Sequence, residues 1–356
     1  MDLITKLAAN RILTSEELQT LILTEDPALR TKLFRFAQKI SGLNFHNKVF
    51  IRGLIVFTNH CQRDCFYCGF RCSNKHAERY RLTKEQILTC CKNGYALGFR
   101  TFVLQGGEDH FFTDNIMCDI ISTIKNTYKD CAITLSLGEH SSSSYKNFYD
   151  AGADRYVLRH ETADSLHFSR LHPPSYSLAE RKNSLYSLKK IGYQVGTGFM
   201  VGSPYQLTEY FVADLEFIKE LNPAIIDIAP FIPNDDTPFR HQEPGSLEIT
   251  LRLIAILRLM FPQALITSAA NLSSLHPNGL QHGILSGANQ IMLDLTPANI
   301  SARGFSHSQI TATQEELEAT LRSLNNQLKS AGYGLCVDRG DYQPETTLLK
   351  NNKENN

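Results

Sequence analysis

The sequence predicts an α/β fold, a (β/α)8 TIM-type barrel with an N-terminal helical lead-in. Eight short apolar runs with strand character follow one another from residue 52 onward, and each gap between them is long enough for a crossover helix. Two of the gaps also carry signals that start a helix. Eight βα units in series favour a closed barrel over an open doubly wound sheet, which is the alternative arrangement.

The segment before this repeat is predicted to be helical. One helix begins after Thr14 or Ser15, and a second begins after Pro27 and ends near Gly42. At the other end, the sequence KNNKENN is too polar to pack, so we expect a frayed tail. The chain therefore divides into an N-terminal helical extension (1–45), the barrel (46–335) and a C-terminal tail (336–356).

The barrel strands are predicted from short runs rich in β-branched and aromatic residues. Between them, Thr83 with Gln86 and Ser177 with Glu180 have the spacing of a capping box. Gly192 is placed to end the second of these helices in a left-handed conformation. The eight predicted strands cover residues 52–57, 101–104, 133–137, 155–158, 195–201, 225–229, 264–268 and 290–293.

The composition limits the class of partner. The 356 residues include 36 basic and 36 acidic side chains, and 42% of the residues are hydrophobic. Such a balance predicts a globular protein whose overall charge does not attract nucleic acid or an anionic membrane. We therefore expect a small-molecule partner. The first residues lack the pattern of a signal peptide, and no stretch reaches the roughly 18 apolar residues of a membrane span. We therefore expect a soluble cytoplasmic protein.

Three of the nine cysteines lie in one loop. Cys61, Cys65 and Cys68 directly follow the first predicted strand, and active sites in this fold lie at the C-terminal ends of the strands. Clustered thiols without an export signal indicate metal binding. Three thiolates on a four-iron cluster would leave one iron open for an exogenous ligand, as expected of an enzyme. If Cys72 is a fourth ligand, a non-catalytic iron–sulfur or zinc protein with four cysteine ligands is the alternative.

The next strand ends also carry polar residues. Arg155 and Arg159 are four residues apart on the fourth predicted strand and therefore share a face. An arginine that faces into a barrel needs an anionic partner or a wet cavity, and for Arg155 an ion pair with Asp154 or Glu139 is the alternative. The polar groups expected at this end of the barrel are Gln105, Gly106, Gly107, Glu108, Thr134, Ser136, Arg159, His160 and Glu161.

The strings around these residues resemble those of radical S-adenosylmethionine enzymes. The CxxxCxFYC spacing after a first βα strand is similar to the cluster motif of that superfamily, and the GGE at residues 106–108 is similar to its cofactor-binding motif. The longer strings TLSLGE and AGADRYVLRHETA resemble the HydE family of [FeFe]-hydrogenase maturases, with the biotin synthase and methylornithine synthase families related to it.

The resemblance implies a [4Fe-4S] cluster and S-adenosyl-L-methionine as cofactors. It implies an enzyme that reductively cleaves S-adenosylmethionine and uses the 5′-deoxyadenosyl radical in assembly of the [FeFe]-hydrogenase active-site cluster. The residues that it implies are the metal ligands Cys61, Cys65 and Cys68, the cofactor-binding residues Tyr67, Gly106, Gly107, Glu108, Ser136, Glu161 and Arg181, and the substrate-binding residues Arg52, Gln105, Thr134 and Arg159.

The resemblance also implies partners. These are a small anionic substrate, such as an iron-containing precursor derived from cysteine, an external flavodoxin or ferredoxin as electron donor, and other hydrogenase maturases. An amino-acid mutase of the methylornithine synthase type and a biotin-synthase-like enzyme are the alternatives. Because Cys336 is the only cysteine after Cys131, we expect no second cluster, which disfavours biotin synthase. Residues 298–310, with Arg303, His307 and Ser308, match no motif.

Overall fold

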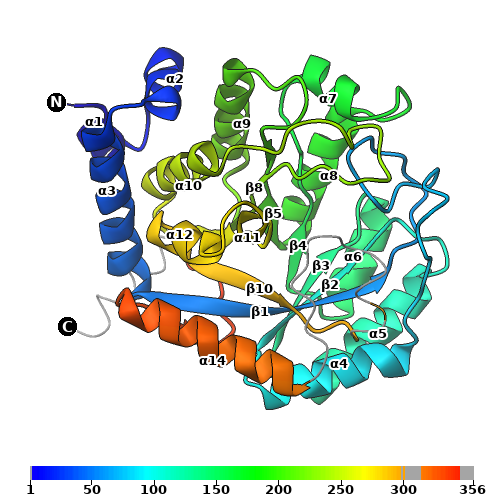
Figure 1. The fold of residues 1–356 in the computed structure, drawn as a ribbon. Helices are drawn as coiled ribbons and strands as arrows, with labels where there is room; N and C mark the ends of the chain where they lie inside the picture. The colour runs from blue at the N-terminus through cyan, green and yellow to red at the C-terminus, as the bar shows by residue number, and fades with distance from the viewer. Residues whose placement is uncertain (1, 298–299, 301–313, 345–356) are drawn as a thin grey trace.

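The N-terminal extension is helical, as predicted. The computed structural model describes residues 2–297, 300 and 314–344, and these begin with α1 (Leu3–Asn10), α2 (Ser15–Leu23) and α3 (Pro27–Phe45). Helix α1 was not predicted; its start is stabilised by the side chain of Asp2, which accepts a hydrogen bond from the Thr5 amide. Helix α3 packs against α10 (Leu247–Met260) on the outside of the barrel (Figure 1).

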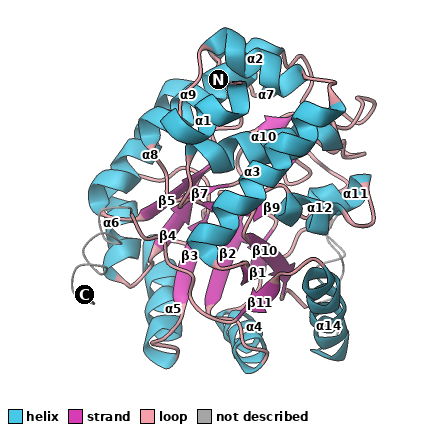
Figure 2. Cartoon of the chain, turned by 90° about the vertical axis from the view of Figure 1, so that its left-hand side faces the viewer, coloured by secondary structure: helices cyan, strands magenta, loops and turns pink. Residues whose placement is uncertain are grey.

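Parallel strands close into a barrel, which confirms the predicted fold class. Strand β1 (Lys48–Thr58) pairs in parallel with both β2 (Thr101–Gly106) and β10 (Gln290–Asp294), so the sheet has no free edge at this junction. Helices surround the strands (Figure 2). The strands between β2 and β10 in this sheet are β3 (Ala132–Ser136), β4 (Arg155–Val157), β5 (Gln194–Thr197), β7 (Ile225–Ile226) and β9 (Leu265–Ser268).

Two of the predicted strands are each split in two. The run 195–201 forms β5 and then β6 (Met200–Val201), and the run 225–229 forms β7 and then β8 (Ala229–Pro230). Strands β6 and β8 pair with each other in a separate small sheet. The chains come so close at the break that a Cβ on Gly198 would lie 1.8 Å from the carbonyl oxygen of Asp227. Glycine at this position therefore permits the close approach of the two segments.

The crossover helices begin and end where the sequence signals predicted. Thr83 and Gln86 form a complete capping box, whereas Ser177 only accepts the hydrogen bond from the Glu180 amide. Gly192 ends α8 with a φ of 116°. Within the described residues, no helix combines the length and the apolar character needed to cross a membrane. The helices after the extension are α4 (Lys84–Ala96), α5 (Asp114–Thr127), α6 (Ser142–Asp150), α7 (Ser165–Leu171), α8 (Leu178–Ile191), α9 (Thr208–Leu221), α10, α11 (Asn271–Leu275), α12 (Gly279–Leu285) and α14 (Gln314–Ser330).

The C-terminal segment closes the N-terminal end of the barrel. Strand β11 (Gly334–Cys336) pairs in parallel with the start of β1. The carbonyl oxygens of Arg339 and Gly340 then accept hydrogen bonds from two guanidinium groups inside the barrel, those of Arg52 and Arg155. The expectation of a frayed tail from residue 336 is therefore wrong for residues 336–344, because the buried arginines bind their backbone. Residues 345–356 lie outside the described part of the chain.

The partner of Arg155 differs from both residues considered in the sequence. Its side chain is 1% exposed, and its Nη2 donates to Oδ1 of Asp341 at 2.6 Å. Asp154 instead pairs with Lys125 and Arg339. The arginine at this position is thus explained by an ion pair with the C-terminal segment, which we call the floor segment (residues 338–342).

Candidate metal and cofactor site

The three predicted metal ligands lie together in the loop after β1. Cys61, Cys65 and Cys68 are free, partly buried thiols, and we call them the ligand cysteines. Burial raises the pKa of all three, and that of Cys68 to about 11. A bound metal must therefore displace the thiol protons, which is the usual coupling of metal binding to deprotonation.

The donor set of the loop consists of thiols. In the part of the chain that the structure describes, no three His, Cys, Asp or Glu side chains surround one ion position. An iron–sulfur cluster takes its cysteines at separate irons, and three partly buried cysteines in one loop fit that requirement. Cys72 is exposed and its amide donates to the carbonyl oxygen of Arg63 at 2.8 Å.

The glycines after β2 allow a second segment to lie against the cysteine loop. A Cβ on Gly107 would lie 2.2 Å from the carbonyl oxygen of His60 and 2.6 Å from Cβ of Cys61, and a Cβ on Gly106 would lie 2.7 Å from Cγ2 of Thr58. Such distances exclude any side chain unless the loop moves. The GGE segment and the cysteine loop therefore form one wall of the site.

Glu108 and Glu139 hold two arginines in a continuous charged network. Arg63 donates from Nε to Glu108 at 2.5 Å and from Nη2 to Glu139 at 3.2 Å, and Glu108 also accepts the Glu139 amide at 3.0 Å. Arg181 donates to the other oxygen of Glu139. Burial alone would lower the pKa of Arg181, but the Glu139 carboxylate raises it above its ordinary value. The sequence did not single out Arg63 or this role of Glu139.

Arg159 and Glu161 face each other after β4. Arg159 Nη2 lies 3.0 Å from Glu161 Oε2, and Nε of Arg159 is buried without a hydrogen-bond partner. Burial raises the pKa of Glu161, against the lowering effect of Arg159. Buried polar atoms without partners are rare in native proteins, so Nε of Arg159 marks a position where a polar group could bind.

Tyr67, which precedes Cys68 in the cysteine loop, contacts a histidine. Its hydroxyl lies 3.1 Å from Nε2 of His172, whose Nδ1 lies 2.9 Å from the carbonyl oxygen of Phe168. Burial lowers the pKa of His172 to about 3 and raises the pKa of Tyr67. The histidine is therefore neutral near pH 7 and orients the tyrosine ring by a neutral contact.

The remaining predicted residues lie at different heights in the barrel. Gln105 and Ser136 are neighbours in the β2–β3 register, near the C-terminal ends of these strands. Thr134 is buried two residues lower and lies beside Arg155 in the register. Arg52 lies near the start of β1, six residues before Thr58, which is about 20 Å along a strand. The structure therefore does not bring Arg52 to the cysteine loop.

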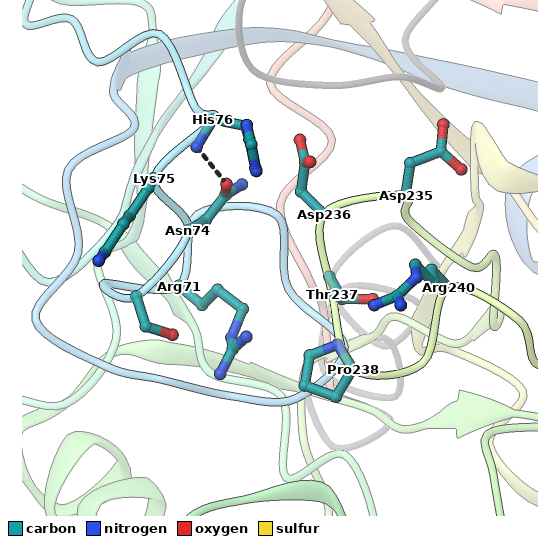
Figure 3. Close-up of a pocket in the computed structure, with 10 residues that line it drawn as sticks. Arg71, Asn74, Lys75, His76, Asp235, Asp236, Thr237, Pro238 and Arg240 are labelled. Atoms are coloured by element: carbon teal, nitrogen blue, oxygen red, sulfur yellow. Dashed lines mark hydrogen bonds between the residues drawn. The ribbon is translucent and has the colours of Figure 1, made fainter.

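Two cavities lie beside the cysteine loop. One of about 300 Å³ is lined by Cys61 and Cys72 together with Arg79, Arg81 and Phe111. The other, of about 540 Å³, lies between the segment after Cys68 and the loop after β8 (Figure 3). It is lined by Arg71, Ser73, Asn74, Lys75, His76, Asp235, Asp236, Thr237, Pro238 and Arg240. Residues 298–310, with Arg303, His307 and Ser308, lie outside the described residues apart from Ile300.

One class of radical enzymes has this arrangement, a closed βα barrel with a three-cysteine loop at its mouth, a GGE segment beside that loop and a buried carboxylate. The sequence profile described as "Radical SAM superfamily" matches residues 55–218. The [FeFe] hydrogenase maturase subunit HydE of Thermotoga maritima is 38% identical over 288 residues, which cover 81% of this chain and 82% of that protein. The chain belongs to the radical SAM superfamily and, within it, to the family of HydE.

Other relatives lie further away. The 3-methylornithine synthase of Methanosarcina acetivorans is 27% identical over 322 residues, covering 90% of this chain and 89% of that protein. The crystal structure of methylornithine synthase superposes with a TM-score of 0.82 at 25% identity, over 94% of this chain and 97% of that one. The chain is thus an enzyme of a family that uses a [4Fe-4S] cluster and S-adenosylmethionine.

Proposed function

We propose that this protein is a HydE-type maturase, which cleaves S-adenosylmethionine and uses the resulting radical in assembly of the active-site cluster of [FeFe]-hydrogenase. The observation that carries the proposal is the buried Nε of Arg159 without a hydrogen-bond partner, on an arginine paired with Glu161 inside a barrel whose mouth carries the ligand cysteines. Identity of 38% to a HydE over most of both chains supports the choice of this function within the superfamily.

The side chains at the mouth fit the two cofactors. When bound, the reduced cluster and S-adenosylmethionine together supply a 5′-deoxyadenosyl radical. The ligand cysteines would hold the cluster, Glu108 and the backbone of the GGE segment would take the ammonium group, and Arg181 the carboxylate. The carboxylate of Glu161, whose Oε2 lies 3.0 Å from Arg159 Nη2, would accept the ribose hydroxyls. Tyr67 would lie beside the adenine and Ser136 beside the methionyl moiety.

The protein then contributes electrostatics and exclusion of water. In this structure Glu108 pairs with Arg63, and Arg181 pairs with Glu139. The ammonium and carboxylate groups of S-adenosylmethionine would therefore replace partners of the same charge. The floor segment closes the other end of the barrel, which keeps solvent and stray hydrogen donors from a radical formed at the mouth.

The substrate proposed is a small anion, such as an iron-containing precursor derived from cysteine. Nε of Arg159 is the buried donor without a partner that such an anion would use, with Gln105 and Thr134 on the adjacent strands. Arg52 is left out, because its guanidinium binds Gln290, Thr101 and the floor segment. Delivery by a partner maturase and reduction by a flavodoxin or ferredoxin in the cytoplasm complete the proposal.

A mutase of the methylornithine synthase type is the second candidate. It is favoured by the extent of the likeness, since 97% of the crystallised synthase superposes at a TM-score of 0.82. A biotin-synthase-like sulfur insertion is less favoured, because Cys336 is the only cysteine after Cys131 and its thiol lies against Asp338.

Two assays test the proposal. The reconstituted and reduced enzyme should form 5′-deoxyadenosine from S-adenosylmethionine, and a variant with alanine at the ligand cysteines should not. The same enzyme should then replace HydE when apo-hydrogenase is activated with the other maturases in vitro. Cofactor cleavage without hydrogenase activation, together with formation of 3-methylornithine from an isomeric amino acid, would select the mutase instead.

A further inference from the structure

The segment that carries Arg159 and Glu161 has a strained conformation. Glu161 has a φ of 65°, which costs a residue with a side chain about 1 kcal/mol, and its amide donates to the carbonyl oxygen of Gly198 at 3.1 Å. The Met200 amide in turn donates to the carbonyl oxygen of Glu161 at 3.2 Å. Such conformations persist where surrounding contacts determine them, so the contacts on either side of Glu161 decide where its carboxylate points.

A fully buried histidine and aspartate supply those contacts. His160 and Asp214, both 0% exposed, lie with Nε2 and Oδ1 3.2 Å apart. Oδ1 of Asp214 also accepts the amide of Ala163 at 2.5 Å. On the other side, Nδ1 of His160 lies 2.9 Å from the hydroxyl of Thr197. Asp214 therefore holds the backbone after Glu161 through the Ala163 amide. His160 contacts Thr197, which in turn binds the backbone before Glu161.

The hydrogen-bond directions fix where protons must lie. The Thr197 hydroxyl donates its single proton to the carbonyl oxygen of Leu158 at 2.9 Å, so it can only accept from Nδ1 of His160. A neutral histidine with its proton on Nδ1 presents a lone pair at Nε2. Since Oδ1 of Asp214 is also an acceptor, one further proton has to lie between the two residues.

The burial of this pair favours its neutral form. Burial lowers the pKa of His160 and raises the pKa of Asp214, so the shared proton resides on the carboxyl group. The rings of Phe199 and Phe217 pack on the imidazole, with centroids 5.9 Å and 4.9 Å away. A carboxylic acid beside a neutral imidazole avoids a buried charge, and its proton provides the partner that Nε2 of His160 otherwise lacks, while Oδ2 of Asp214 stays without one.

We propose that His160 and Asp214 are a proton-sharing pair that positions Glu161 for the ribose of S-adenosylmethionine. The inference rests on the proposed function, in which Glu161 binds that ribose. Neither residue of the pair touches the cofactor: both are positioning residues that act through the strained backbone between them.

The variants Asp214→Leu and Asp214→Asn test the pair. Asparagine is the neutral mimic of a protonated aspartate; because Oδ1 makes both contacts in the wild type, its side-chain amide has to rotate for the oxygen to accept from the Ala163 amide and the NH2 to donate to Nε2 of His160. In the reconstituted enzyme, Asp214→Leu should weaken binding of S-adenosylmethionine about tenfold, as for coupled neighbours, and Asp214→Asn less than about threefold. His167→Gln is the matched control, because His167 on α7 is also fully buried but its Nε2 contacts the carbonyl oxygen of Pro204, in the loop after β6. It should cost stability and leave the affinity unchanged.

A double-mutant cycle separates positioning from general destabilisation. In a Glu161→Ala background, Asp214→Leu should cause little further loss of affinity, because the positioned group is already gone. An equal loss in both backgrounds, or an Asp214→Asn enzyme that behaves like Asp214→Leu, would overturn the proposal. If Asp214→Leu fails to fold, Thr197→Val removes the other contact of His160 and takes its place in the cycle.

Amide hydrogen exchange provides a readout that does not need the cofactor. Protection of residues 158–163 should fall in Asp214→Leu and remain in Asp214→Asn and His167→Gln. If the wild-type enzyme binds no S-adenosylmethionine, the proposed function fails, and the exchange result alone decides whether the pair holds this segment. Unchanged protection in Asp214→Leu would exclude it.

Discussion

The ion pair between Arg155 and the floor segment should stabilise the whole barrel, and Asp341→Ala tests it. Removing one partner of a buried ion pair costs about 3–5 kcal/mol, because a charge remains buried. Two features reduce this figure. Asp341 is 34% exposed, so water screens part of the interaction. Arg155 also keeps hydrogen bonds to the carbonyl oxygens of Arg339 and Gly340 at 2.8 and 3.3 Å.

We therefore expect Asp341→Ala to lower the free energy of unfolding by about 1–3 kcal/mol, the range of a hydrogen bond to a charged group. In a domain of this size that corresponds to a fall in Tm of about 2 °C per kcal/mol. Urea unfolding at pH 7, followed by circular dichroism, measures it. Asp236→Ala in the exposed loop after β8 is the control and should stay within about 0.5 kcal/mol of wild type.

The dependence on pH provides a second check of the same pair. Burial alone would raise the pKa of Asp341, but hydrogen bonds from Arg339 and the charge of Arg155 lower it below its ordinary value. A lowered folded-state pKa gives stability that is present above the unfolded pKa, about 3.9, and is lost as the pH falls through the folded value. The difference in the free energy of unfolding between wild type and Asp341→Ala should thus become smaller below about pH 4. If this difference at pH 7 is no larger than that for Asp236→Ala, the reasoning is refuted.

Three further outcomes follow from the site. Cys72→Ala should leave the iron content and cluster absorbance of the reconstituted protein intact, whereas alanine at any ligand cysteine should abolish the cluster; loss of the cluster in Cys72→Ala would select the four-ligand alternative. Gly107→Ala should lower iron content at least severalfold, since its Cβ would lie 2.2 Å from the His60 carbonyl oxygen; an unchanged iron content would mean that the loop yields easily. Burial lowers the pKa of His172 to about 3. As the pH falls from 6.5 to 3, this residue should therefore lower the free energy of unfolding by up to about 1.4 kcal/mol per pH unit. In urea unfolding, His172→Gln should show a weaker dependence of the free energy of unfolding on pH.

Local patterns predicted the strands and the cysteine loop, because both depend on residues close in sequence. The apolar runs have period two or are continuous, and the ligand cysteines sit within one loop, so neither needed knowledge of distant contacts. The break between β5 and β6 was missed, since it depends on the Asp227 carbonyl that approaches Gly198 from another strand. The charged network was missed for the same reason: Arg63 and Glu139 meet only after the barrel has closed.

Alternation along a strand predicted that Arg155 and Arg159 share a face, but it could not say at which end of the barrel each acts. That depends on the C-terminal segment, whose strand β11 (Gly334–Cys336) is too short to give a hydrophobic signal. Its partner, the start of β1, lies almost 290 residues earlier in the chain, as the Arg52 contact with Gly340 illustrates. Sequence reasoning placed Arg52 with the substrate because the resemblance gave it that role, whereas its guanidinium here binds Gln290, Thr101 and Gly340.

The position of the floor segment also has a consequence for the order of folding. Strand β1 leaves the ribosome early, yet its pairing partners β10 and β11 are synthesised only near the end. Contacts of such long sequence separation form slowly, and until then β1 is left with unpaired backbone groups that can associate with other chains. We therefore expect new chains to depend on chaperones until synthesis is almost complete, and cluster insertion to follow release of the chain.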